Sequence, residues 1–80
     1  MTYICKIFGF RPEVNSHVVI ELKRNTRIGR AASLAGFVST VDPDQISLRN
    51  LVLFSPRGRG LRTEDYRSIP VESIELGYQI

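Results

Sequence analysis

The sequence predicts one small all-β domain spanning residues 1–80, a barrel of about five strands, and three patterns carry this prediction. Residues 18–23 alternate between apolar and polar side chains, which is typical of a half-buried strand. Residues 26–40 are rich in small side chains, as expected of a strand that bends to close a barrel. The alternation changes phase around residues 71–73, which indicates a single 3₁₀ turn between two strands.

The first strand is expected to face the core with Val18, Ile20 and Leu22, because successive side chains of a strand point to opposite faces. A tight turn is expected at residues 24–25, since asparagine tolerates the left-handed backbone conformation that hairpin turns need.

The second strand is expected to run from about residue 26 to residue 40. Gly29 and Gly36 are the candidate positions for its bend. A short helix over residues 30–37 is the alternative, because alanine and leucine are good helix formers. The strand is favoured, since the neighbouring segments also have strand character.

Residues 41–44 are expected to form a turn, since Pro43 fixes one backbone angle. Residues 45–54 have the strongest strand character, and their pattern becomes continuously apolar after Asn50. This change predicts either burial on both faces or a bulge at Asn50. Residues 55–62 contain proline and two glycines and are expected to form a loop.

Both ends of the chain are expected to contribute strands. Residues 3–10 are a candidate strand that ends at Arg11-Pro12. Pro70 is expected at a sheet edge or a strand end, because it lacks a backbone N–H. The last strand follows the phase change at residues 71–73, and its alternating apolar residues are Ile74, Leu76 and Tyr78.

The alternating first strand, the bent strand through Gly29 and the closing segment 69–76 together resemble the SH3-like and Sm-like small barrels, over roughly residues 17–79. Members of the Sm-like family commonly form rings and bind RNA. Residues 42–45 read Asp-Pro-Asp-Gln where that family has an Asp followed by a Met-Asn pair. Residues 70–73 read Pro-Val-Glu-Ser where it has an Arg-Gly pair. The resemblance therefore implies an architecture, and no RNA-binding residue is carried over.

No pattern in the sequence predicts catalysis, a metal or a cofactor. Cys5 and His17 are the single cysteine and the single histidine, so zinc sites and disulfides are not expected. His17 precedes a strand without a nucleophile motif, and Asp42 and Asp44 supply too few oxygen ligands for calcium. We expect a non-enzymatic protein with no small-molecule substrate.

The sequence also predicts a cytoplasmic protein that does not enter a membrane. No apolar run approaches the roughly 20 residues that a membrane-spanning helix needs. The first ten residues lack the basic region and the cleavage site of a signal peptide.

Two binding functions are compatible with these features. The first is protein interaction or self-assembly, expected as a homo-oligomer, through a free strand edge at residues 45–54 or 74–80. The second is nucleic-acid binding, because the net charge is +3 and arginine suits bidentate contact with phosphate. The candidate phosphate-binding residues lie in two basic segments and are Arg24, Arg27, Arg57, Arg59 and Arg62.

Overall fold

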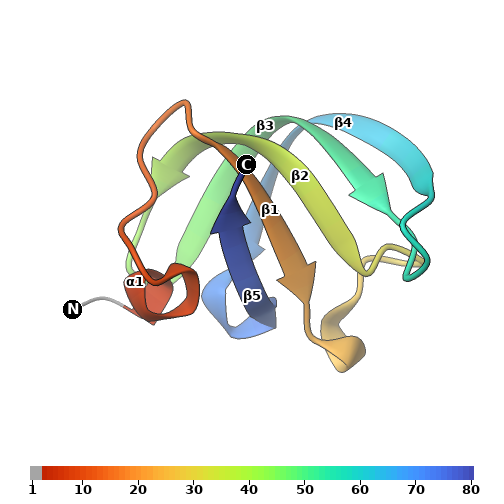
Figure 1. Ribbon diagram of the computed structural model, residues 1–80, viewed down its shortest axis with the longest axis horizontal. Helices are drawn as coiled ribbons and strands as arrows, with labels where there is room; N and C mark the ends of the chain where they lie inside the picture. The colour runs from red at the N-terminus through yellow and green to blue at the C-terminus, as the bar shows by residue number, and fades with distance from the viewer. Residues whose placement is uncertain (1–2) are drawn as a thin grey trace.

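Five strands form one antiparallel sheet in the order β4-β3-β2-β1-β5. The structure is a computed structural model and describes residues 3–80. Figure 1 shows the sheet curling strongly, so that its concave face encloses the core. This arrangement confirms the all-β prediction and leaves β4 and β5 as the two edges. The strands are β1 (His17–Leu22), β2 (Ser33–Val41), β3 (Gln45–Phe54), β4 (Gly60–Pro70) and β5 (Ile74–Gln79).

The core is built from side chains of one helix and all five strands. Val18, Ile20 and Leu22 of β1 face inward, as the alternation predicted. Burial of such side chains is the main stabilising contribution in a domain of this size. The remaining buried apolar residues are Ile4, Phe8, Ala31, Leu34, Val38, Ile46, Leu48, Leu51, Leu53, Ile69 and Ile74.

The predicted N-terminal strand is wrong, because Tyr3–Phe8 forms the short helix α1. Ile4 and Phe8 are both buried, and their spacing of four residues places them on the same helix face. That face packs on β5, where the ring of Phe8 lies over Gly77. The helix therefore covers one part of the core that the sheet leaves open.

The link between β1 and β2 is longer than predicted. Arg24–Thr26 forms the 3₁₀ helix η1 instead of a two-residue hairpin turn. The hydroxyl of Thr26 shares its single proton between the carbonyl oxygens of Lys23 and Ser73, at 3.0 and 3.1 Å, and this bifurcated hydrogen bond ties η1 to the segment before β5. The second strand then begins at Ser33, and the helical alternative for residues 30–37 is wrong.

Bends in β2 and β3 coincide at Gly36 and Asn50, as predicted, whereas the other candidate bend, Gly29, is wrong, because it lies in a turn before β2. The register between the two strands shifts between Ala35 and Phe37, opposite Asn50. Asn50 has a φ of 48°, and the buried side of β3 changes there from Ile46 and Leu48 to Leu51 and Leu53. The bulge alternative is therefore correct: after Asn50, Leu51 and Leu53 are buried, whereas Val52 and Phe54 are only partly buried.

The last third of the chain differs most from prediction. β4 begins at Gly60, so residues 60–62 belong to a strand and the loop is shorter than expected. Pro70 ends this edge strand, and Val71–Ser73 forms the predicted 3₁₀ turn, η2. In β5 a register shift beside Leu22 turns Leu76 and Tyr78 outward.

Candidate functional site

A tight turn after η1 forms one wall of a basic pocket. Ile28 and Ala31 exchange two backbone hydrogen bonds, with N···O distances of 3.2 and 2.9 Å, and Gly29 and Arg30 form the two-residue turn between them. Gly29 has a φ of 59°, which the first central position of a type II′ turn requires. Ala31 is completely buried, so the turn is anchored in the core and presents Arg30 to solvent.

The connection between β3 and β4 forms the opposite wall. The N–H of Gly58 donates to the carbonyl of Ser55 at 2.9 Å, and the N–H of Ser55 donates to the carbonyl of Arg59 at 2.8 Å. Pro56 occupies the first central position of this turn, and Gly58 follows with a φ of 85°. The Ser55 hydroxyl also accepts a hydrogen bond from the N–H of Arg59. The loop is therefore a hydrogen-bonded turn with a defined shape.

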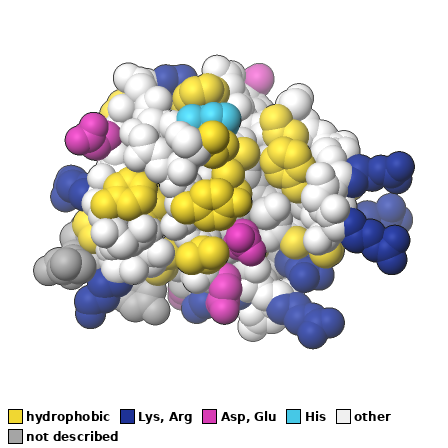
Figure 2. Space-filling view, viewed as in Figure 1, with side chains coloured by type: hydrophobic (Ala, Val, Ile, Leu, Met, Phe, Trp, Pro, Cys, Tyr) yellow, Lys and Arg dark blue, Asp and Glu magenta, His cyan; other side chains and the backbone are white. Residues whose placement is uncertain are grey.

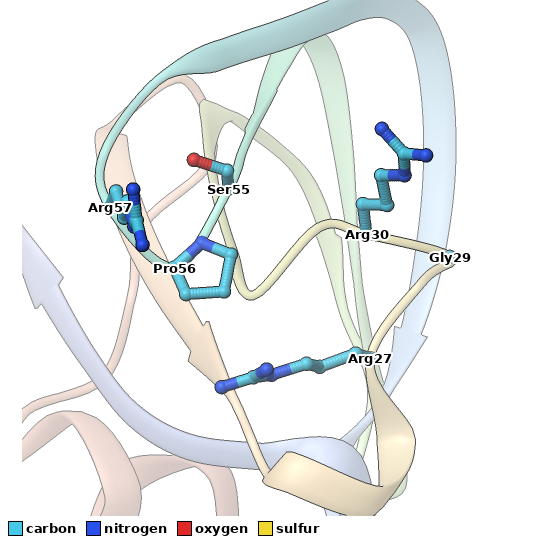
Figure 3. Close-up of a pocket in the computed structure, with 6 residues that line it drawn as sticks. All are labelled: Arg27, Gly29, Arg30, Ser55, Pro56 and Arg57. Carbon is cyan, nitrogen blue, oxygen red and sulfur yellow. The ribbon is translucent and has the colours of Figure 1, made fainter.

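These two turns enclose an open pocket of about 400 Å³. Figure 3 shows Arg27 extending across it toward Pro56, while Arg30 and Arg57 lie on opposite sides. The walls are held together below the pocket, where the N–H of Ala32 donates to the carbonyl of Phe54 at 2.9 Å. The lining contains no carboxylate and consists of Arg27, Gly29, Arg30, Ser55, Pro56 and Arg57.

The structure brings together only part of the predicted set of arginines. Arg27 and Arg57 line the pocket, whereas Arg24 lies on η1 and Arg59 follows the turn; neither lines it. Arg30 was not in the predicted set, although it lines the pocket as directly as Arg27. The signal that would have found it is the adjacent glycine, which marks a turn that projects its neighbour outward.

Arg62 does not line the pocket, and its guanidinium forms an ion pair on β4. Its guanidinium donates to Glu64 at 3.1 Å, and Glu64 also accepts from Arg67 at 2.6 Å. The hydrogen bond from Arg67, with a further one from Arg62, lowers the pKa of Glu64 from 4.5 to about 2. Arg62 therefore has its own carboxylate partner within the fold.

The ion pairs of Glu64 with Arg62 and Arg67 are expected to contribute to the unfolding free energy in a way that depends on pH. Because the pKa of Glu64 is lowered on folding, the contribution is complete above pH 4.5 and is lost as the pH falls toward 2. Replacing Glu64 with glutamine should cost about 1 kcal/mol of unfolding free energy at neutral pH, since partial exposure screens the pairs. Urea denaturation at pH 7 and pH 3 measures this difference.

The neighbouring carboxylate provides the control for this measurement. Asp65 is exposed and pairs with neither arginine, so Asp65→Asn should leave the pH dependence of stability unchanged. Equal pH dependence in the Glu64→Gln variant and the wild type would contradict the assignment.

The two free edges of the sheet differ in character. β4 carries Arg62, Glu64, Asp65 and Arg67 and ends at Pro70, and charges and proline both discourage strand addition. β5 carries one charge, Glu75, and large apolar side chains are exposed in and directly after it. Figure 2, viewed as in Figure 1, shows apolar side chains gathered at the centre of the face on which β1 and β5 lie. The exposed fractions are 46% for Leu76, 45% for Tyr78 and 67% for Ile80.

β3 is not a free edge. It is paired with β2 on one side and with β4 on the other, so the proposed edge at residues 45–54 is wrong. The sequence could not exclude it, because the long polar strand β4 was not expected beside it. Residues 74–80 remain as the predicted edge with an apolar surface.

His17 begins β1 and takes part in a side-chain row across the sheet. Its ring stacks on Phe37 with centroids 4.5 Å apart, and the guanidinium of Arg49 lies 5.7 Å from the centroid of the Phe37 ring. Arg49 in turn donates to the side-chain oxygen of Asn15. These contacts show that the His17 side chain packs against its neighbours on the sheet.

No protein-family model and no curated protein matches this chain. Within residues 3–80, no helix is long and apolar enough to cross a membrane. The same residues contain no group of three or more His, Cys, Asp or Glu side chains arranged to hold a metal ion. The geometry of the described residues leaves two candidate binding sites, the basic pocket and the β5 edge.

Proposed function

We propose that this protein is a non-enzymatic binding module that pairs with a second copy of itself through the free edge of β5. The observation that carries this proposal is the unprotected character of that edge. Three of the seven exposed large hydrophobic side chains in the described part of the chain belong to its last five residues. Unpaired backbone groups on such a strand form hydrogen bonds with another strand, and the apolar side chains gain burial.

A twofold arrangement fits the sequence of β5. Antiparallel pairing centred on Gly77 places Leu76 of one copy beside Tyr78 of the second copy, and Tyr78 beside Leu76 of the second copy. Glu75 then lies opposite Gln79, so no like charges face each other. A twofold interface of this kind is the commonest way in which identical chains associate. It also adds burial to a domain whose own core is small.

The same architecture supports the barrel class suggested by the sequence. The strand order β4-β3-β2-β1-β5, with the 3₁₀ turn η2 directly before β5, is compatible with a small barrel. We propose that the fold belongs to the SH3-like and Sm-like small barrels. Proteins built on one fold serve many functions, so the binding proposal rests on the β5 edge and not on the class.

The proposal predicts that the wild type is a dimer and that Tyr78→Lys converts it to a monomer. A lysine at this position places a charged amine against the apolar side chain of Leu76 of the second copy, and the twofold axis repeats this contact on the other side of Gly77. We expect the dissociation constant to rise at least about tenfold, which corresponds to roughly 1.4 kcal/mol. Light scattering coupled to size-exclusion chromatography, over a range of protein concentrations, measures the change.

Tyr66→Lys is the matched control, because Tyr66 is an exposed tyrosine on the other edge strand. It should leave the dimer intact. A wild-type protein that stays monomeric at the highest concentration overturns the proposal. Dissociation caused by Tyr66→Lys but not by Tyr78→Lys would assign the interface to β4.

A further inference from the structure

We propose that the basic pocket between the two turns binds a nucleoside phosphate, either free or as one unit of a single-stranded nucleic acid. The pocket lies away from the β5 edge, so this binding is independent of self-assembly. Three properties of the pocket favour such a ligand: its charge, the apolar character of its lining and the rigidity of its walls.

The two chain segments that form the pocket carry only positive charges. Residues 23–32 and 55–61 contain six basic side chains and no acidic one. The guanidinium groups of Arg27, Arg30 and Arg57 form no ion pair or hydrogen bond with any residue between 3 and 80, and all three residues are exposed. Three unpaired guanidinium groups around one cavity provide the planar donor pairs that phosphate oxygens accept.

The lining indicates a ligand with a flat apolar part in addition to its phosphate. Most of the surface inside the pocket is apolar, and the ring of Pro56 faces the side chain of Arg27 across it. A site for a bare anion would be lined mainly by donors. Arginine side chains also stack on flat groups, which suits a nucleobase held between Arg27 and Pro56.

The size of the cavity is consistent with one nucleotide. Its volume of about 400 Å³ falls in the range of roughly 300–1,000 Å³ that is usual for small-ligand sites. A base reaches such a pocket only when it is free of a duplex, since a paired base is stacked within the helix. A single strand or a free nucleotide is therefore favoured over double-stranded nucleic acid.

Both walls are held in place before any ligand binds. The Gly29 turn is closed by two backbone hydrogen bonds, and the Pro56 turn is closed by two more together with the Ser55 hydroxyl. A site on structured turns loses less conformational entropy on binding than a site on flexible loops. This rigidity distinguishes the pocket from an ordinary solvated group of surface arginines.

Amide NMR titration with adenosine monophosphate tests the proposal. Resonances of residues 27–30 and 55–58 should shift, and Arg27→Ala or Arg57→Ala should weaken binding about tenfold. Arg11→Ala removes an exposed arginine outside the pocket and should leave the affinity unchanged. Circular dichroism of each variant should match the wild type, because none of these side chains is in the core.

Further probes identify the part of the ligand that is recognised. Inorganic phosphate and adenosine should each bind more weakly than adenosine monophosphate, since each lacks one half of the ligand. A labelled single-stranded RNA that binds more tightly, and is weakened by the same two variants, assigns the pocket to nucleic acid. Equal or tighter binding of adenosine monophosphate assigns it to a free nucleotide.

Three results would overturn the proposal. The first is the absence of any shift at residues 27–30 and 55–58 with every nucleotide probe. The second is an equal loss of affinity in Arg11→Ala, which would indicate attraction by overall charge. The third is binding of inorganic phosphate or of poly-glutamate at least as tight as that of adenosine monophosphate.

Discussion

Replacing Gly36 with alanine is expected to destabilise the protein by about 3 kcal/mol, at the upper end for an overpacked position. A Cβ atom at this position would lie 2.8 Å from the Cβ of Leu51 and 3.2 Å from the carbonyl oxygen of Arg49. One of these neighbours is backbone and the other belongs to a completely buried side chain, so neither can move without cost. The stability of so small a domain is rarely more than roughly 3–5 kcal/mol, and much of it would be lost.

Urea denaturation followed by circular dichroism measures this loss. Gly60→Ala is the matched control, because a Cβ at Gly60 would meet only Val52, at 4.0 Å, an ordinary contact. Its unfolding free energy should remain close to that of the wild type. A Gly36→Ala variant as stable as the control would mean that β2 and β3 do not approach each other this closely at the bend.

Replacing Phe8 with alanine is expected to lower the unfolding free energy by about 3 kcal/mol, because it removes the ring that packs α1 against β5 and leaves a cavity. Gly77→Ala should act on the same contact from the other side. Its Cβ would lie 2.5 Å from the nearest atom of the Phe8 ring, so the helix must shift outward, at about 2 kcal/mol.

A double-mutant cycle separates this contact from other effects of the two substitutions. With Phe8 already alanine, the added methyl group at Gly77 enters vacated space and should cost almost nothing. The double variant should therefore be nearly as stable as Phe8→Ala alone, as measured by urea denaturation. Additive losses would show that α1 does not pack on β5 through this pair.

The parts of the fold that sequence reasoning predicted correctly have local causes. The alternation of Val18, Ile20 and Leu22 follows from the geometry of a single strand, and the turn at Val71–Ser73 follows from a change of phase. β4 was missed because Ile69 is its one buried side chain, so its sequence shows almost no alternation of apolar and polar residues. α1 was misread because six residues are too few to separate the helical period from the strand period.

The outward orientation of Leu76 and Tyr78 depends on a partner strand. The register shift opposite Leu22 moves their side chains to the exposed face, and nothing within β5 itself signals this. The basic pocket also depends on strand pairing that no local sequence pattern indicates. Each basic segment is visible in the sequence, but the pairing of Ser33 with Phe54 brings the two turns together, and that pairing is a property of the whole sheet.

The packing of α1 and β1 against β5 also determines the order in which the fold can form. The meander β1-β2-β3-β4 pairs strands that follow one another in the chain, whereas Val18 of β1 pairs with Gln79 of β5 across most of the described residues. Contacts between distant segments carry a larger loop-closure entropy and form more slowly than local ones. We therefore expect β1 to join the local meander through β2 first, and α1 and the β1–β5 pairing to complete the fold after it.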